Sequence, residues 1–506
     1  MDTYQKKRLV TEVFLTLVLA FGLSYSWAYR SELLDLDVTY LTVGIAEGRF
    51  AVDTPMAHYG VPLDSVRVDN NTYLKVLPGL AYVASVPFRV VEDAAALPPL
   101  KDLTAFLRRF VAIPLTLLGF LGFRRLLRTQ LVDEPVIDVV SVAVFFGTPM
   151  FWAGRYLSVD AFLACLLAAA MWALHTLESR PMSPAKGTLV GFGAGCAMGW
   201  ATISHPLGWL VAVMVFLYGV SGPIRYHRPS MMAMLLAIGG GIALWGYLGN
   251  VLVGGAIGLQ IADRWETGLI TDFLSLEHGM LAAAPVLWLT VLGIPSLWQA
   301  RPRRRAVFYG LAPLILLFAA YFALPDPYGV LPVVAVLMGV GVAAAIDAAQ
   351  MPATFGIYRG LAACAVVTSV LTVGVLGLTP QMLEDPYWSL LAASVSAEVF
   401  APNLLGQFGM KGLVTVIPVA SLALLMAAFV LLRGVTDVGA RGRQITAGVI
   451  AVVVLAVSLG VVTKAGGYWT PQREKAVMKK IDPLNKHQRG MKQGMDQVIR
   501  DVGSMK

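Results

Sequence analysis

The chain has 506 residues, of which 57% are hydrophobic and 14% charged, and it carries a formal net charge of +8. Its apolar runs repeatedly exceed the roughly 18 residues that span a bilayer, which excludes a soluble globular protein and argues against a nucleic-acid partner. All three cysteines lie inside apolar runs, so neither a disulfide framework nor a cysteine-based metal site is indicated.

Hydropathy predicts an all-α polytopic membrane protein with about thirteen transmembrane helices, whose ends are uncertain by several residues. The first apolar run follows Lys6, Lys7 and Arg8 but lacks a small-residue cleavage site, so we predict a retained signal anchor. The predicted spans lie near residues 9–28, 104–123, 136–154, 158–177, 187–204, 206–220, 231–254, 280–298, 306–324, 329–346, 359–378, 412–432 and 444–463.

Lysine and arginine predict the orientation, because cationic loops stay on the cytoplasmic side. Loops rich in these residues, such as 124–128 and 301–305, alternate with loops that are poor in them, and we interpret 301–305 as a topology signal only. This pattern predicts a multi-pass plasma (inner) membrane protein whose N-terminus is cytoplasmic and whose C-terminus is outside. Three outside segments, 29–103, 252–280 and 379–411, exceed the length of simple turns, which favours a functional site on that face.

The chain divides into three predicted parts: a module at 1–350, additional helices at 351–463, and a tail at 464–506. The tail carries ten Lys or Arg against four Asp or Glu. It is either a solvated or headgroup-bound segment that contacts membrane lipids, or a docking surface for an anionic acceptor or partner.

The first outside loop contains Asp35 and Asp37, followed by a pattern that suits a short interfacial helix ending at Gly48. Either acid is a good N-cap for that helix. Lys75 begins a membrane-edge apolar segment, where a lysine either snorkels to headgroups or binds a phosphate. Carboxylates and a cation in one loop also suit a base for an acceptor hydroxyl and a clamp for a phosphate leaving group.

Several short motifs in this order resemble the GT-C class of integral-membrane glycosyltransferases, in the protein-mannosyltransferase and aminoarabinose-transferase branch. The resemblance covers roughly residues 5–350. The acids here are separated by Leu36, whereas that branch often has adjacent Asp-Glu. The segment Pro325-Asp326-Pro327-Tyr328-Gly329 also lacks the nearby arginine that some relatives have. The matching segments are Asp35-Leu36-Asp37, Ile45-Ala46-Glu47-Gly48, Asp53-Thr54-Pro55, Tyr73-Leu74-Lys75-Val76-Leu77-Pro78-Gly79, Gly147-Thr148-Pro149-Met150-Phe151-Trp152, Ser158-Val159-Asp160-Ala161 and Glu277-His278-Gly279-Met280-Leu281.

The resemblance implies inverting transfer of a sugar from a polyprenyl-phosphate donor to an envelope glycan, lipid or protein acceptor outside the cytoplasm. Asp37 or Asp35 is then the base, and Lys75 with a nearby arginine stabilises the lipid phosphate. The expected donor-binding residues are Lys75, Tyr73, Arg264 and Arg109, and the expected cavity-lining residues are Tyr40, Asp160, His278 and His58.

Each of these residues also has a purely structural explanation, such as a helix cap, an ion pair or a contact with lipid headgroups. Asp160 is either a helix N-cap, an ion-pair partner of Arg155, or a contact of donor or acceptor. Arg264 is either a phosphate ligand or part of a neutralised surface cluster, and Arg109 either contacts phosphate or snorkels. His58, His205 and His278 lack metal-ligand spacing, so a divalent metal is compatible with them but not indicated, and no cofactor is certain.

Two other functions fit a polytopic protein. A transporter or lipid flippase calls for ionisable residues in mid-span and repeated halves, and here mid-span charges are scarce and no repeat is apparent. A non-catalytic scaffold of an envelope complex would leave the outside acids dispensable.

Overall fold

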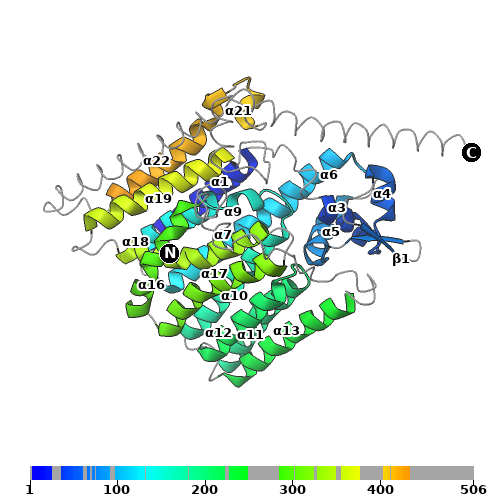
Figure 1. Ribbon diagram of the computed structural model, residues 1–506, viewed down its shortest axis with the longest axis horizontal. Coiled ribbons are helices and arrows are strands. Elements are labelled where there is room, and N and C mark those ends of the chain that lie inside the picture. Colours follow the sequence, from blue (N-terminus) through cyan, green and yellow to red (C-terminus); the bar gives the residue numbers. More distant parts are fainter. Residues whose placement is uncertain are drawn as a thin grey trace, which may run out of the picture.

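A computed structural model of the chain shows a helical bundle with a smaller unit at one side (Figure 1). The structure describes residues 3–25, 36–60, 65–68, 71–74, 76–91, 97–130, 133–179, 182–222, 227–248, 284–300, 302–323, 327–348, 355–376, 403–410 and 412–432.

The bundle consists of long helices that share one large apolar core. Within the described residues, six helices are long and apolar enough to cross a membrane. The described part of each predicted span from 9–28 to 412–432 contains helical structure, and the span at 444–463 lies outside the described residues. The bundle elements are α1 (Thr3–Tyr25), α7 (Ile113–Gln130), α8 (Glu134–Phe146), α9 (Met150–Ala153), α10 (Val159–Ser179), α11 (Pro184–Thr202), α12 (Gly208–Ser221), α13 (Arg228–Tyr247), η3 (Pro285–Trp288), α16 (Leu289–Ala300), α17 (Arg303–Ala323), η4 (Pro327–Val330), α18 (Leu331–Ala348), α19 (Phe355–Leu376), α21 (Leu404–Gln407), η5 (Gly412–Val416) and α22 (Ile417–Leu432).

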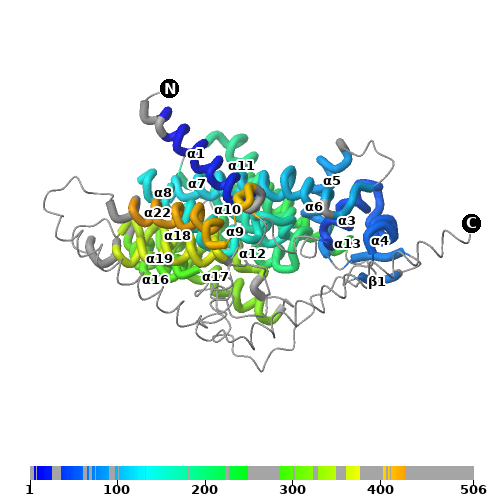
Figure 2. The backbone as a smooth tube through the Cα atoms, turned by 90° about the horizontal axis from the view of Figure 1, so that it is seen from above, coloured from blue at the N-terminus to red at the C-terminus, as the bar shows by residue number. Residues whose placement is uncertain are grey.

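The smaller unit, which we call the loop unit, is built from the first outside loop and has its own apolar core. Figure 2 shows this blue unit beside the bundle. Leu157, just before α10, and Phe162, in its first turn, belong to the loop unit's core, so the two parts meet there. The elements of the loop unit are α3 (Leu36–Ala46), α4 (Asp53–Tyr59), β1 (Ser65–Val68), β2 (Asn71–Leu74), α5 (Gly79–Val91) and α6 (Leu100–Leu107).

Helix α3 confirms the predicted helix after Asp35. It ends before Gly48, whose φ of 79° is a left-handed conformation that glycine adopts at little cost. Arg89 of α5 donates a hydrogen bond from Nη2 to the carbonyl of Ile45 at 2.6 Å. The last turn of α3 is therefore satisfied by a side chain from the helix that packs against it.

The loop unit also contains an antiparallel hairpin, which the helical prediction missed. Strands β1 and β2 pair Ser65 with Leu74 and Val68 with Asn71. Asp53 accepts a hydrogen bond at Oδ1 from the amide of Thr72 at 3.0 Å, which ties the start of α4 to β2. The Asp53-Thr54-Pro55 motif therefore has a structural role in joining these elements.

One continuous helix connects the loop unit to the bundle. Helix α6 runs through a π-helical turn, η1 (Arg108–Ala112), directly into α7. Arg108 in this turn is buried and donates from Nη2 to the carbonyl of Leu23 at 2.7 Å. The extra residue of a π turn is therefore held by a contact with α1.

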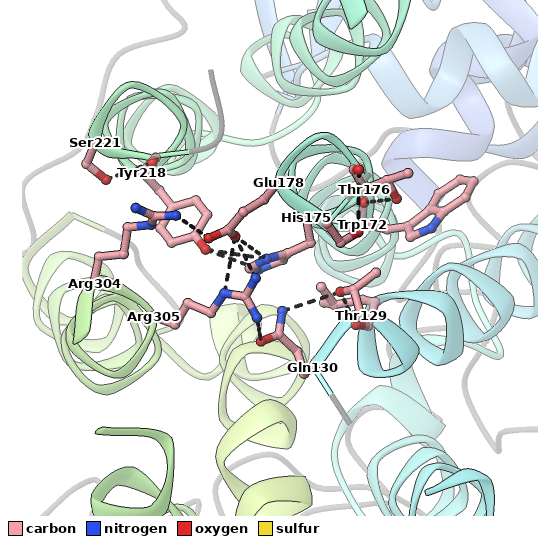
Figure 3. A network of polar contacts seen from close by, with 12 residues as sticks. Thr129, Gln130, Trp172, His175, Thr176, Glu178, Tyr218, Ser221, Arg304 and Arg305 are labelled. Atoms are coloured by element: carbon pink, nitrogen blue, oxygen red, sulfur yellow. Dashed lines mark hydrogen bonds and ion pairs between the residues drawn. The ribbon is translucent and has the colours of Figure 1, made fainter. Parts of the chain in front are cut away.

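A polar network lies at the opposite end of α10 from Asp160 (Figure 3). Arg305 is buried, and it contacts Glu178 Oε2 from Nη2 at 2.6 Å and donates from Nη1 to Gln130 Oε1 at 2.7 Å. Arg304 pairs with the other oxygen of Glu178. The 301–305 segment thus does more than mark topology, because two of its cations hold α17 to α10 and α7.

We expect Glu178→Gln to lower stability by about 3 kcal/mol, because it leaves the buried Arg305 guanidinium without a counter-charge. Thermal unfolding of the purified protein in detergent measures this loss. Arg303→Gln is the matched control, because Arg303 belongs to the same segment and is exposed. A Glu178→Gln protein that unfolds at the wild-type temperature would contradict the assignment.

Candidate functional site

Asp37 lies in the first turn of α3 and its side chain is partly buried. Tyr40, one turn later, lies on the same face, because residues three apart are neighbours on a helix. The Tyr40 hydroxyl donates to the carbonyl of Gly60 at 3.1 Å, and its burial, with smaller effects from Tyr59 and Asp37, raises its pKa. Tyr40 is therefore a neutral, buried bridge to the end of α4. Asp35 lies outside the described residues.

The end of α4 is aromatic and hydrogen-bonded to the loop that follows α5. Tyr59 donates to the carbonyl of Pro98 at 2.6 Å, and burial raises the pKa of Tyr59 to about 12. His58 is exposed and contacts the Tyr59 ring edge-on, with ring centroids 5.3 Å apart. The structure thus places His58 on the outer side of α4.

The Tyr73–Gly79 motif begins in the hairpin and ends at helix α5. Tyr73 lies in β2 opposite Val66 and is half-buried. Lys75 lies outside the described residues, and its two neighbours, Leu74 and Val76, are described.

The end of this motif is fixed to the bundle. The Gly79 amide donates to the carbonyl of Ile203 at 2.8 Å, and the indole Nε1 of Trp200 donates to the Gly79 carbonyl at 3.0 Å. A Cβ at position 79 would lie 2.0 Å from Ser204 Oγ and 2.9 Å from the Ile203 carbonyl oxygen. Only glycine allows this close approach, so the loop that carries Asp37 and Lys75 is attached to the turn between α11 and α12.

Asp160 lies at this junction, in the first turn of α10. Its Oδ1 is 2.8 Å from Nε2 of His205, and its side chain keeps 22% of its exposure while that of His205 keeps 3%. The helix N-cap is Ser158, whose Oγ accepts from the Ala161 amide at 3.2 Å. Asp160 is therefore neither the cap nor a surface acid; it is one half of a carboxylate–imidazole pair.

Sequence reasoning grouped His205 with Asp160 only as residues that could line one outside cavity, and it did not predict a direct pair between them. They lie 45 positions apart and share no motif. The neighbouring Arg155 is buried, and its guanidinium carbon lies 4.7 Å from the centre of the Phe151 ring. The pair forms because the end of α11 lies beside the start of α10, and no local sequence pattern indicates that arrangement.

Three predicted site residues remain: Arg109, which is exposed, and Arg264 and His278, which lie outside the described residues. Arg109 is exposed on the η1 turn, in contrast to the buried Arg108. In the part of the chain that the structure describes, no group of three or more His, Cys, Asp or Glu is arranged to hold a metal ion.

The Gly147–Trp152 motif shapes the neighbouring turn. Thr148 Oγ1 accepts from the Met150 amide at 3.2 Å, and the Trp152 indole donates to the Val373 carbonyl at 2.8 Å. A Cβ at Gly147 would lie 2.5 Å from the Ala143 carbonyl oxygen. These contacts give the motif a structural role, in joining α8, α9 and α19.

No protein-family model matches the sequence, and no curated protein matches it. Solved structures do. The apo structure of ArnT from Cupriavidus metallidurans aligns with a TM-score of 0.50 and 16% identity, over 89% of this chain and 78% of ArnT. The undecaprenyl phosphate complex of the same ArnT gives a TM-score of 0.49 at 16% identity, over 88% and 77%. The oligosaccharyltransferase AglB from Archaeoglobus fulgidus, in complex with an inhibitory peptide and a dolichol-phosphate, gives 0.49 at 11% identity, over 78% of this chain and 58% of AglB.

At this identity the likeness to apo ArnT concerns the fold. The alignment extends over most of both chains. It confirms the polytopic helical fold that the motifs predicted. The chain therefore shares its fold with ArnT, the GT-C fold to which the sequence resemblance pointed.

Proposed function

We propose that the protein is an inverting membrane glycosyltransferase that takes a sugar from a polyprenyl-phosphate carrier and delivers it to an extracytoplasmic acceptor. The observation that carries this proposal is the attachment of Gly79 to the Ile203 turn. It holds the acid-bearing loop unit beside the Asp160–His205 pair, in a fold shared with ArnT. The same ArnT has a structure with undecaprenyl phosphate, which suggests the class of carrier.

The proposed reaction is a direct displacement. The acceptor hydroxyl oxygen attacks the anomeric carbon, the bond from that carbon to the phosphate oxygen breaks, and the configuration inverts. Asp37 or Asp35 takes the hydroxyl proton, and the polyprenyl phosphate leaves with the bonding electron pair. Lys75, with Arg109 or Arg264, stabilises the charge on the phosphate, and Tyr73 contacts the same group.

The proposal includes the predicted orientation. The loop unit and the first turn of α10 face the outside of the plasma membrane, and the Glu178 network faces the cytoplasm. The acceptor is an envelope glycan, a lipid or a protein. Residues 1–350 form the catalytic module, 351–463 add helices, and the basic tail at 464–506 lies outside.

Incubation of the purified protein in lipid with radiolabelled polyprenyl-phosphate monosaccharides tests the proposal. Labelled sugar should move to an envelope acceptor fraction, with release of polyprenyl phosphate. Transport of the intact carrier between leaflets without release of the phosphate would identify a flippase and contradict the proposal.

We expect Lys75→Ala to weaken donor affinity by about ten- to hundredfold, the effect of losing one charged hydrogen bond to phosphate. Binding of undecaprenyl phosphate to the protein in nanodiscs measures this effect. Arg67→Ala is the matched control, because it removes an exposed cation from the hairpin that precedes Lys75 in the chain. Unchanged affinity in the Lys75→Ala protein would remove the phosphate role.

A further inference from the structure

The hydrogen bonds of His205 determine its tautomer. Its Nδ1 accepts from the backbone amide of Leu207 at 3.0 Å. A backbone amide only donates, so Nδ1 carries no proton. The proton of the neutral ring is therefore on Nε2, which lies 2.8 Å from Asp160 Oδ1. His205 thus donates from Nε2 to the carboxylate of Asp160.

Two connections meet within the short turn that contains His205. In this turn, the Ile203 carbonyl accepts a hydrogen bond from the Gly79 amide, and the His205 side chain contacts Asp160. His205 is itself buried, with 3% of its side chain exposed. The turn therefore sets where the loop unit lies relative to the carboxylate of Asp160.

The opposite side of that carboxylate faces a glycine. A Cβ at Gly329 in η4 would lie 3.3 Å from both carboxylate oxygens of Asp160. Any side chain at position 329 would therefore contact the carboxylate of Asp160, and glycine avoids that contact. Oδ1 of Asp160 is held by His205, and Oδ2 accepts only a long hydrogen bond, at 3.5 Å, from Ser158 Oγ, so Oδ2 can accept from a further donor.

We propose that His205 is a positioning residue for sugar transfer. It fixes the rotation of the Asp160 carboxylate, so that Oδ2 of Asp160 accepts a hydrogen bond from a sugar hydroxyl on the side that Gly329 borders. This inference rests on the proposed glycosyltransferase function and extends it to residues outside the sequence motifs. Carboxylates that accept from hydroxyls at a fixed angle orient a substrate, and orientation contributes strongly to rate.

Paired substitutions at His205 separate its two hydrogen bonds. Asparagine places an acceptor where Nδ1 is and keeps the bond from the Leu207 amide, but it is too short to reach Asp160. Glutamine places a donor where Nε2 is. We expect His205→Asn to lower kcat/KM for sugar transfer about ten- to hundredfold. His205→Gln should restore it to within about threefold of wild type.

Coupling with Asp160 gives a second measure. Asp160→Asn should reduce transfer, and the double variant with His205→Asn should be no slower than Asp160→Asn alone, because His205 acts through that carboxylate. Gly329→Ala should reduce transfer while the Asp160–His205 bond stays intact. Full, additive loss in the double variant would overturn the proposal.

A spectroscopic measurement is independent of activity. Nitrogen-15 NMR of histidine-labelled wild-type protein should show His205 neutral with its proton on Nε2, and Asp160→Asn should shift the Nε2 signal. A proton on Nδ1 would overturn the proposal, and this reading stands even if His205→Asn fails to fold. Wild-type protein that transfers no sugar contradicts the proposed function; active wild type with equally active His205→Asn contradicts the positioning role alone.

Discussion

Simultaneous replacement of Asp35 and Asp37 by asparagine is expected to abolish sugar transfer while the protein still inserts and folds. A positioned general base contributes about a hundred- to ten-thousandfold to a rate, and asparagine cannot take the acceptor proton. The substitution keeps side-chain size, and α3 contributes only apolar residues to the core of the loop unit. Transfer rates and thermal unfolding, measured on the same preparation, separate the two effects.

The single variants identify the base. The variant whose loss equals that of the double variant carries the proton, and the other acid is then an electrostatic neighbour. Asp102→Asn is the control, because Asp102 is an exposed acid in the first turn of α6 in the same unit. Retention of full transfer by the double variant would exclude both acids as the base.

Gly79→Ala is expected to reduce transfer by about a hundredfold or more. The added Cβ would lie 2.9 Å from the backbone carbonyl oxygen of Ile203, so the loop unit must move away from the bundle. A displacement of about 1 Å at a reacting centre costs on the order of a hundredfold in rate. Kinetics of transfer, with limited proteolysis of the loop unit, measure both consequences.

The control for this substitution is Gly239→Ala. Gly239 lies in α13, and a Cβ there meets no atom within 4 Å. Ser204→Ala in the Gly79→Ala background removes the nearest clashing atom, Oγ, and should recover part of the activity. A Gly79→Ala protein with wild-type transfer and wild-type resistance to proteolysis would show that the attachment is dispensable.

The bundle was predictable because its signal is local. An apolar run of bilayer length fixes a helix almost regardless of its neighbours, and α10 and α18 fall where hydropathy places them. Helix α3 was predictable for a similar reason, since its stop signal at Gly48 lies in the same short stretch of sequence. For the candidate site, the same local pattern predicted that Asp37 lies at the start of this helix, and the structure has it in the first turn of α3.

The parts that were not predictable depend on contacts between distant segments. His205 pairs with Asp160 because α11 ends beside α10, and nothing in either local sequence states that arrangement. The hairpin has a two-residue Asp69-Asn70 connection between alternating strands, a signal that was present in the sequence. It was missed because the surrounding apolar runs favoured an all-helical interpretation. Arg305 was missed because the positive-inside rule already accounted for it.

The continuous helix through α6, η1 and α7 joins the loop unit to the bundle without a break. Its stretch Asp102–Gln130 has 29 residues, or about 43 Å of helix, against a hydrocarbon core of about 30 Å. Leu103 and Leu107 at one end belong to the loop unit's core, and Phe120 and Phe123 further along belong to the bundle's core. The continuous helix therefore sets the distance between the core of the loop unit and the core of the bundle. In the proposed glycosyltransferase, this helix would set the height at which the loop unit meets the phosphate of the carrier.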